Sequence, residues 1–449
     1  MGLLFGTDGI RGIANTYPIT CEVALKTGRA IGLFTKEKGH TAVIIGKDTR
    51  ISGDMLESAI AAGVASTGVD VLLAGVIPTP GVAYLCLAIK NAGAGIVISA
   101  SHNPYQDNGI KIFKSGGEKL SDKQEAKIEE YILNSKNVSQ GKVGKISIIS
   151  DSLKQYTDFL LTKFPFKKLD KKLKLIIDCS NGAASKISHM VFNNLLFDAN
   201  FLFDSPDGKN INKDCGSQHT KELKTRVLKE KADIGLAFDG DADRLIAVDE
   251  KGNEISGDRI IAVCAKFANT NGNLNQNIVV STIMSNIGLS KMLYNEGIQH
   301  LKADVGDRKV LEQMKKSGAV IGGEDSGHII FLDSHTTGDG MLSALKLLEV
   351  MIETDESLSS LAAVMQIYPQ VLKNVNLPAS YPDLMRNKMV VDTIQIIEDK
   401  LGDKGRVLIR YSGTQPLLRV MVEGPDQGLI DEYCVLICES IKTVLKDEL

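Results

Sequence analysis

The sequence predicts an α/β protein in which three related α/β domains with mixed sheets precede a smaller C-terminal α+β domain. Three observations predict this fold class. The 449 residues exceed what one hydrophobic core normally organises. Apolar β-branched runs alternate with alanine-rich helical runs, an order that gives largely parallel strands joined by helices. A polar turn follows a buried strand at three comparable places along the chain.

The first domain shows the alternation most clearly. Thr41–Gly46 (TAVIIG) has the apolar, β-branched composition of a buried strand, and Val69–Leu73 and Gly95–Ser99 are similar. Between the first two, Asp54–Thr67 has the small, apolar face of a packed helix. We therefore expect a two-sided sheet covered by helices.

The strand-to-helix exit after Thr41–Gly46, KDTRISG, has two counterparts downstream. Leu173–Asp178 is followed by the turn Cys179–Ser185, and Asn277–Ser281 is followed by Thr282–Gly288. We interpret the three exits as one per related domain. The predicted domains are residues 1–150, 151–250 and 251–367.

Residues 368–449 follow a different pattern and predict a small α+β domain. Its expected strands are Val371–Leu377, Arg406–Tyr411 and Leu418–Glu423, and its expected helices are Asn387–Lys400 and Leu429–Val444.

The overall composition argues against several classes of protein. The 52 basic and 55 acidic residues give a net charge of −3, so no broad nucleic-acid-binding surface is expected. The sequence contains no apolar run of about 18 residues that would span a membrane, and no secretory signal is visible. The seven scattered cysteines are expected to be reduced thiols in a cytoplasmic protein. Dinucleotide-binding and P-loop glycine motifs are absent from the sequence.

The segment Ser99–Phe113, SASHNPYQDNGIKIF, is the first candidate for chemistry. It follows a buried strand, and ligands of open α/β sheets bind at the carboxyl ends of strands. It supplies a hydroxyl nucleophile, an imidazole and an amine in Ser101, His102 and Lys111. A polar turn marked by its N-P and N-G pairs explains the segment about equally well.

The segment DGDADR places Asp239, Asp241 and Asp243 at alternate positions after the apolar strand Ala232–Phe238, with Arg244 behind them. Three carboxylates at the end of a buried strand would be costly unless they converge on a cation. Oxygen ligands suit Mg²⁺ or Ca²⁺, and the calcium-loop pattern is incomplete here. A solvated acidic turn is the less favoured alternative.

The segment RYSGTQPLLR has a composition suited to phosphate binding. Two hydroxyls and the backbone amides around a glycine lie between two arginines, although a hairpin turn would have the same composition. The candidate residues are Arg410, Ser412, Gly413, Thr414 and Arg419.

Two glycine-rich segments complete the set. GGEDSGH offers Glu324 and Ser326 for sugar hydroxyls and His328 for a phosphate or a proton. FGTDGIRG places Arg11 between glycines near the start of the chain. Each of them alone could be an ordinary connection.

Together, the segments SASHNP with DNGIK, DGDADR, GEDSGH and RYSGT resemble the α-D-phosphohexomutase family, in the family's order and over nearly the whole chain. The resemblance implies four domains around a central cleft. It also implies an isomerase that moves a phosphoryl group between sugar hydroxyls. The active serine would be phosphorylated, and a sugar 1,6-bisphosphate would be intermediate and activator.

Carried over to this sequence, the resemblance assigns roles to the candidates. Mg²⁺ would be held by phosphorylated Ser101 and by Asp239, Asp241 and Asp243, with Arg244 and His102 beside them. Lys111, His328 and Arg11 would handle protons and charge. The substrate would be bound by Glu324, Ser326, Arg410, Ser412, Gly413, Thr414 and Arg419.

Features such as FGTDGIRG, VGDRKV and RVMVEG resemble the bacterial members that interconvert glucosamine 6-phosphate and glucosamine 1-phosphate. Two positions depart from that pattern. Asp325 stands where glutamine is usual, and Gln415 stands where glutamate or asparagine is commoner. The alternative is a member acting on mannose or glucose phosphates by the same mechanism. The expected partner is a small phosphosugar, not nucleic acid or a membrane. The enzyme is expected to be a monomer or homodimer. Its last domain is expected to close over the substrate.

Overall fold

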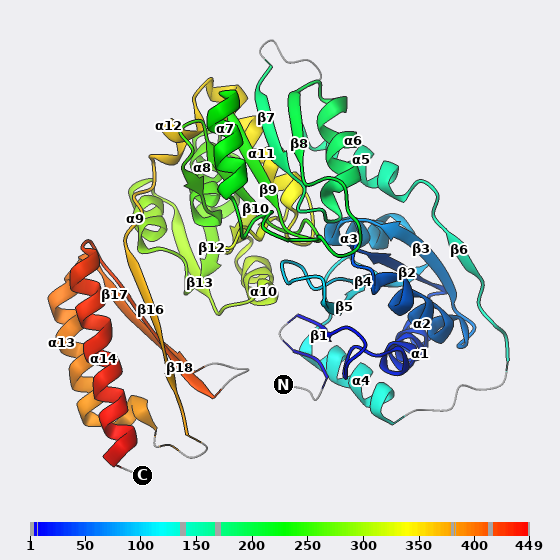
Figure 1. The fold of residues 1–449 in the computed structure, drawn as a ribbon, viewed down its shortest axis with the longest axis horizontal. Coiled ribbons are helices and arrows are strands. Elements are labelled where there is room, and N and C mark those ends of the chain that lie inside the picture. The colour runs from blue at the N-terminus through cyan, green and yellow to red at the C-terminus, as the bar shows by residue number, and fades with distance from the viewer. Residues whose placement is uncertain are drawn as a thin grey trace. The chain divides into compact units, whose positions relative to one another are not determined.

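The computed structural model describes residues 4–6, 8–134, 141–166, 172–378, 381, 383–411 and 416–447, and the chain divides into two compact units. Unit 1 consists of Met1–Met284 and Gly297–Val364, and unit 2 consists of Ser285–Glu296 and Met365–Leu449. Each unit is described by itself. Unit 1 holds three mixed sheets flanked by helices and unit 2 holds one small sheet with helices (Figure 1), which confirms the predicted fold class.

The first sheet of unit 1 has the strand order β1-β5-β4-β2-β3-β6. Its central strand is covered on both faces: Val43 and Ile45 belong to the core beneath α1 and α2, whereas Gly46 faces Val82 of α3. The elements are β1 (Ile10–Ile13), α1 (Cys21–Glu37), β2 (Ala42–Lys47), α2 (Gly53–Ala65), β3 (Asp70–Val76), α3 (Thr79–Ala88), β4 (Ala92–Ile98), β5 (Asp107–Lys114), α4 (Asp122–Leu133) and β6 (Ile146–Ile148).

The second sheet has the order β11-β10-β9-β7-β8. Strand β9 is fully buried, which suits its uninterrupted apolar sequence IGLAF. The elements are α5 (Ser152–Thr162), β7 (Lys174–Asp178), α6 (Ala184–Asn194), β8 (Asp198–Leu202), α7 (Lys221–Glu230), β9 (Ile234–Phe238), β10 (Leu245–Asp249) and β11 (Glu254–Ile255).

The third sheet has the order β13-β12-β14-β15, and helices α8, α10 and α11 pack against its strands. The elements are α8 (Gly257–Thr270), a 3-10 turn (Asn275–Asn277), β12 (Ile278–Thr282), β13 (Gln299–Ala303), α10 (Asp307–Ser317), β14 (Ile321–Gly323), β15 (Ile329–Phe331), α11 (Gly340–Thr354) and α12 (Leu358–Ala362).

The three sheets share one topology, which supports the interpretation of three related domains. Each contains a central strand with a parallel neighbour on either side, and a fourth strand that pairs antiparallel with one of those neighbours. The matching orders are β3-β2-β4-β5, β8-β7-β9-β10 and β13-β12-β14-β15.

Unit 2 is built on an antiparallel sheet of order β16-β18-β17 with α13 and α14 packed against it. Helix α9, although its chain segment runs between β12 and β13, also belongs to this unit, and the amide of Ile287 donates to the buried carboxylate of Glu423 over 2.9 Å. The elements are α9 (Ile287–Asn295), β16 (Gln370–Asn376), a 3-10 turn (Leu384–Arg386), α13 (Lys388–Leu401), a 3-10 turn (Gly402–Lys404), β17 (Arg406–Tyr411), β18 (Leu417–Glu423) and α14 (Gln427–Asp447).

Candidate active site

Three of the predicted functional segments occupy equivalent places in the three related domains. Ser101 lies on the β4–β5 connection, Asp239–Arg244 on the β9–β10 connection, and Glu324–His328 on the β14–β15 connection. Each connection follows the third parallel strand, at its carboxyl end, and turns the chain into the antiparallel fourth strand. The repeated topology therefore presents one loop from each domain for a common site.

The Ser101 hydroxyl lies against the acidic turn. Its Oγ donates to Oδ2 of Asp239 over 2.5 Å, and Nδ1 of His102 lies 3.2 Å from the same oxygen. Ser101 is only 1% exposed, and its backbone has the left-handed φ of 53°, which is unusual for a residue other than glycine. Gly240 allows this approach, because a Cβ there would lie 2.5 Å from the Ser101 carbonyl oxygen.

Asp239, Asp241 and Asp243 form a buried carboxylate cluster whose ligand atoms all lie within 4.8 Å of one another. One oxygen each of Asp241 and Asp243 is buried without a hydrogen-bond partner in the described part of the chain. Burial, followed by the charges of Asp243 and Asp241, raises the pKa of Asp239 well above its usual range. The oxygen-only donor set with unsatisfied buried atoms fits a hard divalent cation.

Lys111 reaches the carboxylate cluster from β5. Its Nζ lies 2.7 Å from Asp241, 3.3 Å from Asp243 and 3.5 Å from Asp8, and its side chain is 1% exposed. Burial lowers the pKa of Lys111, but the neighbouring carboxylates more than offset burial and raise this pKa well above its usual value. The amine is therefore held as a cation at neutral pH.

His328 is buried between two carboxylates. Its Nδ1 lies 3.7 Å from Asp243 and its Nε2 lies 3.6 Å from Asp307. Although burial opposes the charged form, Asp243 and then Asp307 raise the pKa of His328 above its ordinary value. This arrangement favours a protonated imidazole beside the cluster.

Arg244 and Arg11 supply further positive charge. The Arg244 amide donates to Oδ1 of Asp239 over 3.2 Å, and its guanidinium lies 3.8 Å from Asp243. Arg11 pairs with Asp8 and contacts the Ala100 carbonyl oxygen at 3.5 Å. Burial, Arg244 and Arg11 together lower the pKa of His102 to about 4, so this imidazole is neutral.

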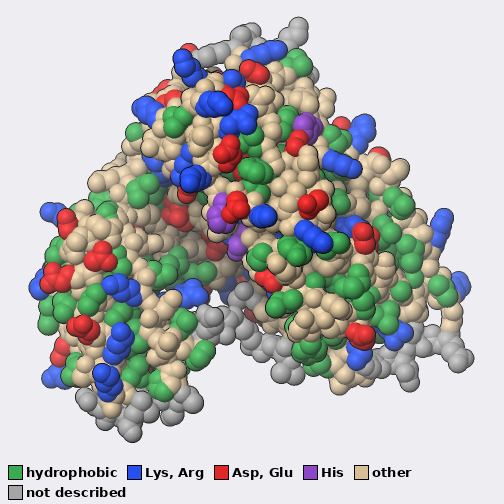
Figure 2. Space-filling view, in the orientation of Figure 1, with side chains coloured by type: hydrophobic (Ala, Val, Ile, Leu, Met, Phe, Trp, Pro, Cys, Tyr) green, Lys and Arg blue, Asp and Glu red, His purple; other side chains and the backbone are tan. Residues whose placement is uncertain are grey.

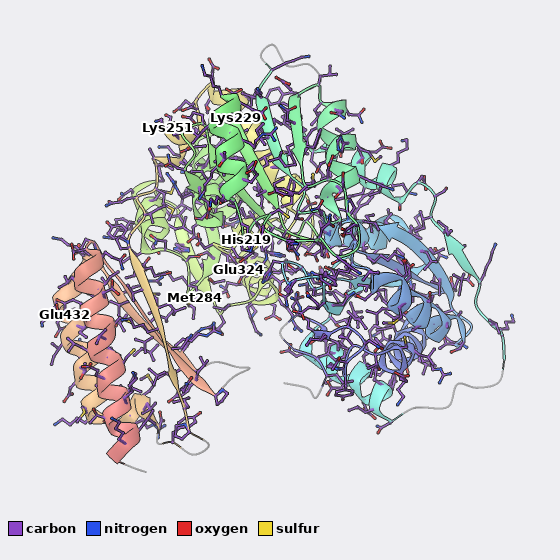
Figure 3. The ribbon with its side chains drawn as sticks, viewed as in Figure 1. His219, Lys229, Lys251, Met284, Glu324 and Glu432 are labelled. Atoms are coloured by element: carbon purple, nitrogen blue, oxygen red, sulfur yellow. The ribbon has the colours of Figure 1, made fainter. Side chains whose placement is uncertain are left out.

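The β14–β15 loop brings Glu324 beside Arg244, and Glu324 accepts from the Gly306 amide over 3.1 Å. Figure 3 labels Glu324 near the centre of the picture, whereas Lys229 and Lys251 lie toward the top of unit 1. Ser326 is partly buried on the same loop. The exposed Asp325 instead accepts from the Asp258 amide over 3.3 Å, at the first turn of α8.

Several residues at the site were not predicted from the sequence. Lys119 pairs with both Asp8 and Asp307, which links the first-domain segment to the N-terminus of α10 beside His328. The Thr79 hydroxyl, at the start of α3, donates to Asp241. Asp8 and Asp307 lie in FGTDGIRG and VGDRKV, so these segments held an available signal, whereas nothing in the local sequence singled out Lys119 or Thr79.

The predicted phosphate-binding segment lies on unit 2. Arg410 and Arg419 are directly opposite one another in the antiparallel β17–β18 pair. Ser412, Gly413 and Thr414 lie outside the described residues. The structure therefore brings the two arginines together and leaves the role of this segment a prediction.

The surface agrees with the charge balance of the sequence. Acidic and basic side chains of the described residues are interspersed on the visible surface of each unit in Figure 2. Every helix in the described residues is too short or too polar to span a lipid bilayer.

Comparison with known proteins identifies the family. Four domain families match in chain order: phosphoglucomutase/phosphomannomutase alpha/beta/alpha domains I (residues 2–139), II (154–252) and III (256–368), and the C-terminal domain (372–440). The chain is 57% identical to phosphoglucosamine mutase of Desulforapulum autotrophicum, covering 98% of this chain and 99% of that protein. It is 50% identical to the same-named protein of Syntrophus aciditrophicus, over the full length of both.

Solved structures show the same fold. A phosphoglucomutase/phosphomannomutase family protein from Burkholderia thailandensis matches with a TM-score of 0.83 and 24% identity, over 98% of this chain and 97% of that one. Aspergillus fumigatus N-acetylphosphoglucosamine mutase, solved in complex with GlcNAc-6P and magnesium, matches with a TM-score of 0.69 and 16% identity, over 99% and 96%. The chain therefore belongs to the α-D-phosphohexomutase family, in which its highly identical relatives are bacterial phosphoglucosamine mutases.

Proposed function

We propose that the chain is a phosphoglucosamine mutase that interconverts glucosamine 6-phosphate and glucosamine 1-phosphate through phosphorylated Ser101 and a 1,6-bisphosphate. The observation that carries this proposal is the 2.5 Å contact between the Ser101 hydroxyl and Asp239 in a buried carboxylate cluster. A binding protein would not need a nucleophile beside three buried carboxylates. The names of the full-length relatives support the choice of glucosamine.

The residues that would hold the metal are Asp239, Asp241, Asp243 and an oxygen of phosphorylated Ser101, and Mg²⁺ fits this set of hard oxygen donors. When bound, Mg²⁺ neutralises charge on the phosphoryl group and makes the phosphorus a better electrophile. The unsatisfied oxygens of Asp241 and Asp243 support this assignment.

In the proposed first step, phosphorylated Ser101 gives its phosphoryl group to the sugar. The bond between phosphorus and Ser101 Oγ breaks while a bond to O1 of glucosamine 6-phosphate forms. The O1 hydroxyl loses its proton and Ser101 Oγ gains one. In the second step, the bond between phosphorus and O6 of the bisphosphate breaks while a bond between phosphorus and Ser101 Oγ forms. Ser101 Oγ loses its proton, O6 gains one, and glucosamine 1-phosphate is released.

The charges at the site suggest a division of roles. Lys111, held as a cation, would neutralise the phosphoryl oxygens, and Arg11 and Arg244 would add to this effect. His328, whose pKa is raised by Asp243 and Asp307 against the effect of burial, is the better candidate to deliver a proton. The neutral His102, 3.2 Å from Ser101 Oγ, would orient the hydroxyl.

Substrate binding completes the proposal. Glu324 and Ser326 would bind sugar hydroxyls, and Arg410, Ser412, Gly413, Thr414 and Arg419 would bind the phosphate that is not reacting. The work divides over the domains 1–150, 151–250, 251–367 and 368–449. All seven cysteines are free thiols, which supports a cytoplasmic location. The working state is proposed to be a monomer or homodimer.

A substrate panel tests the choice of sugar. Initial rates would be measured with Mg²⁺ and a catalytic amount of the matching 1,6-bisphosphate, on glucosamine 6-phosphate, mannose 6-phosphate and glucose 6-phosphate. The proposal expects the highest kcat/KM on glucosamine 6-phosphate. A higher kcat/KM on mannose or glucose phosphate would instead assign the alternative mutase specificity. Release of inorganic phosphate without isomerisation would identify a phosphatase.

A further inference from the structure

A buried arginine in the first strand exit, KDTRISG, holds the loop that carries Ser101. The side chain of Arg50 is 0% exposed. Its Nη2 donates to the carbonyl oxygens of Ser101 over 2.9 Å and Asn103 over 2.8 Å, and its Nη1 donates to those of Pro104 and, over 3.0 Å, Asp107. One guanidinium therefore donates to four carbonyl oxygens of the loop that carries Ser101.

Asp48 orients Arg50 and reaches the serine loop a second way. Its Oδ2 accepts from Arg50 Nε over 2.9 Å and from the Ser99 hydroxyl over 2.6 Å. Ser99 Oγ in turn accepts from the Ser101 amide over 2.9 Å. With the bond from Nε to Asp48, all five N–H groups of the Arg50 guanidinium are used. A lysine, which has three donors, could not reproduce this arrangement.

The second domain holds the same loop from the other side. Asn212 Nδ2 donates to the carbonyl oxygens of Ser101 over 2.8 Å and Asn103 over 3.0 Å. The Asn212 amide itself donates to the Ser180 carbonyl oxygen, in the second strand exit, over 2.9 Å. Arg50, in the first strand exit, and Asn212, whose backbone is bonded to the second strand exit, thus both donate to carbonyl oxygens of the loop that carries Ser101.

We infer that Asp48, Arg50 and Asn212 are positioning residues for phosphoryl transfer at Ser101, an inference that rests on the proposed function. Ser101 has a left-handed backbone, so its loop needs outside contacts to remain in one conformation. In-line transfer depends on placing Oγ to within a fraction of an ångström. The positive charge of Arg50 also lies next to the loop to which phosphorylation of Ser101 would add negative charge.

The test compares Arg50→Lys with wild type and with Arg226→Lys, whose arginine lies in the α7 pair with Glu230. Rapid quenched-flow would measure the rate at which glucosamine 1,6-bisphosphate phosphorylates Ser101. The values of kcat, KM and Mg²⁺ affinity would be measured for the same proteins. For Arg50→Lys we expect the phosphorylation rate and kcat to fall about 10- to 100-fold, with KM and Mg²⁺ affinity within about threefold of wild type. Arg226→Lys should match wild type.

Two further variants keep the inference testable if Arg50→Lys folds poorly. Asn212→Asp keeps the residue size and tolerates the left-handed φ of 58° at this position, but it replaces both donors with an oxygen, so the phosphorylation rate should also fall. Arg50→Ala should regain activity when millimolar guanidinium is added, and should not respond to methylammonium.

Folded Arg50→Lys and Asn212→Asp proteins that phosphorylate Ser101 at the wild-type rate would overturn the positioning role. A rise in KM and a loss of Mg²⁺ affinity as large as the loss in kcat would also overturn it, because that pattern indicates general damage to the protein. If wild type itself takes no phosphate onto Ser101 in this assay, the proposed function fails with it. A normal wild type beside normal variants refutes the positioning role alone.

Discussion

At the scale of single residues, the site is made by charges that are unfavourable until they are brought together. Ser101 and Asp239 are 138 residues apart in sequence and share a 2.5 Å hydrogen bond. Three carboxylates within 4.8 Å of one another repel, and burial together with that repulsion raises the pKa of Asp239. Lys111 and His328 offset the repulsion in part, and a divalent cation would complete the neutralisation.

Asp241→Asn is expected to abolish most activity. The substitution keeps the side-chain shape and removes one charge from the proposed metal site, where two carboxylate oxygens have no hydrogen-bond partner among the described residues. We expect kcat to fall by about 100-fold or more, roughly 2.7 kcal/mol of barrier, and Mg²⁺ affinity measured by calorimetry to weaken. Asp198→Asn, on an exposed position of β8, is the matched control. Unchanged Mg²⁺ affinity in Asp241→Asn would contradict this assignment of the metal ligands.

Asp325→Gln tests whether the departure from the family pattern affects sugar choice. Asp325 is exposed and accepts from the Asp258 amide at the first turn of α8, so it anchors its loop to a helix N-terminus. We expect the ratio of kcat/KM for glucosamine and mannose 6-phosphates to stay within about twofold, with a Tm lower by a few degrees. A changed ratio with unchanged Tm would show that this residue reads the sugar.

Some site residues could be predicted from the sequence because the residues next to them in the chain indicate their chemistry. The alternate aspartates of DGDADR and the hydroxyl of SASHNP are of this kind, and the structure brings them together. Lys119 and Thr79 could not be found this way. Each sits in an unremarkable local sequence and meets the site only through long-range folding, with Thr79 contacting Asp241 across 162 residues.

At the scale of elements, the repeated sheet explains why three loops form one site. Each functional loop joins the third parallel strand to an antiparallel fourth strand, so the same turn of the chain is used three times. The central strand predicted at Thr41–Gly46 is observed as Ala42–Lys47, because a continuous apolar run reveals a buried parallel strand. Strand β5, the antiparallel fourth strand of the first sheet, was not predicted individually, because polar residues such as Asn108 and Lys111 interrupt its apolar pattern.

His335 couples the start of α3 to the segment before α11, and this contact predicts a dependence of stability on pH. Its Nε2 donates to the Pro80 carbonyl oxygen over 2.9 Å and its Nδ1 accepts from the Thr336 amide over 2.8 Å, so the neutral ring uses both nitrogens. Burial, and to a smaller extent Lys163, lower the pKa of His335 to about 4. Below about pH 6.5 the unfolded chain gains a proton at this residue that the folded chain does not, so stability falls as the pH drops from 6.5 toward 4.

His335→Gln retains one donor and one acceptor but does not titrate, so the variant should lose less stability over this range. The difference should reach up to roughly 3 kcal/mol at pH 4. Urea unfolding at pH 7.5, 6 and 4 measures it, with His219→Gln as the control, because His219 (labelled in Figure 3) is exposed. Parallel pH profiles for wild type and His335→Gln would contradict the account of this contact.

At the scale of the whole molecule, the groups proposed to carry the reaction are divided between two units. The proposed nucleophile Ser101, the carboxylate cluster and the β14–β15 loop lie on unit 1, whereas the paired Arg410 and Arg419 lie on unit 2. The proposed reaction needs both sets at one substrate. We therefore expect small-angle scattering of the Mg²⁺-loaded enzyme to show a smaller radius of gyration with saturating glucosamine 1,6-bisphosphate. An unchanged scattering curve at saturation would count against closure.

The most direct test of the central claim is the phosphorylation state of Ser101 during turnover. Purified enzyme would be incubated with Mg²⁺ and glucosamine 1,6-bisphosphate, then analysed by intact mass and by peptide mapping. The account predicts a single phosphoryl group on Ser101, regenerated in each turnover of glucosamine 6-phosphate, and no mutase activity in Ser101→Ala. An enzyme that isomerises the sugar phosphate while Ser101 stays unmodified, or a Ser101→Ala variant within about tenfold of wild type, would contradict it.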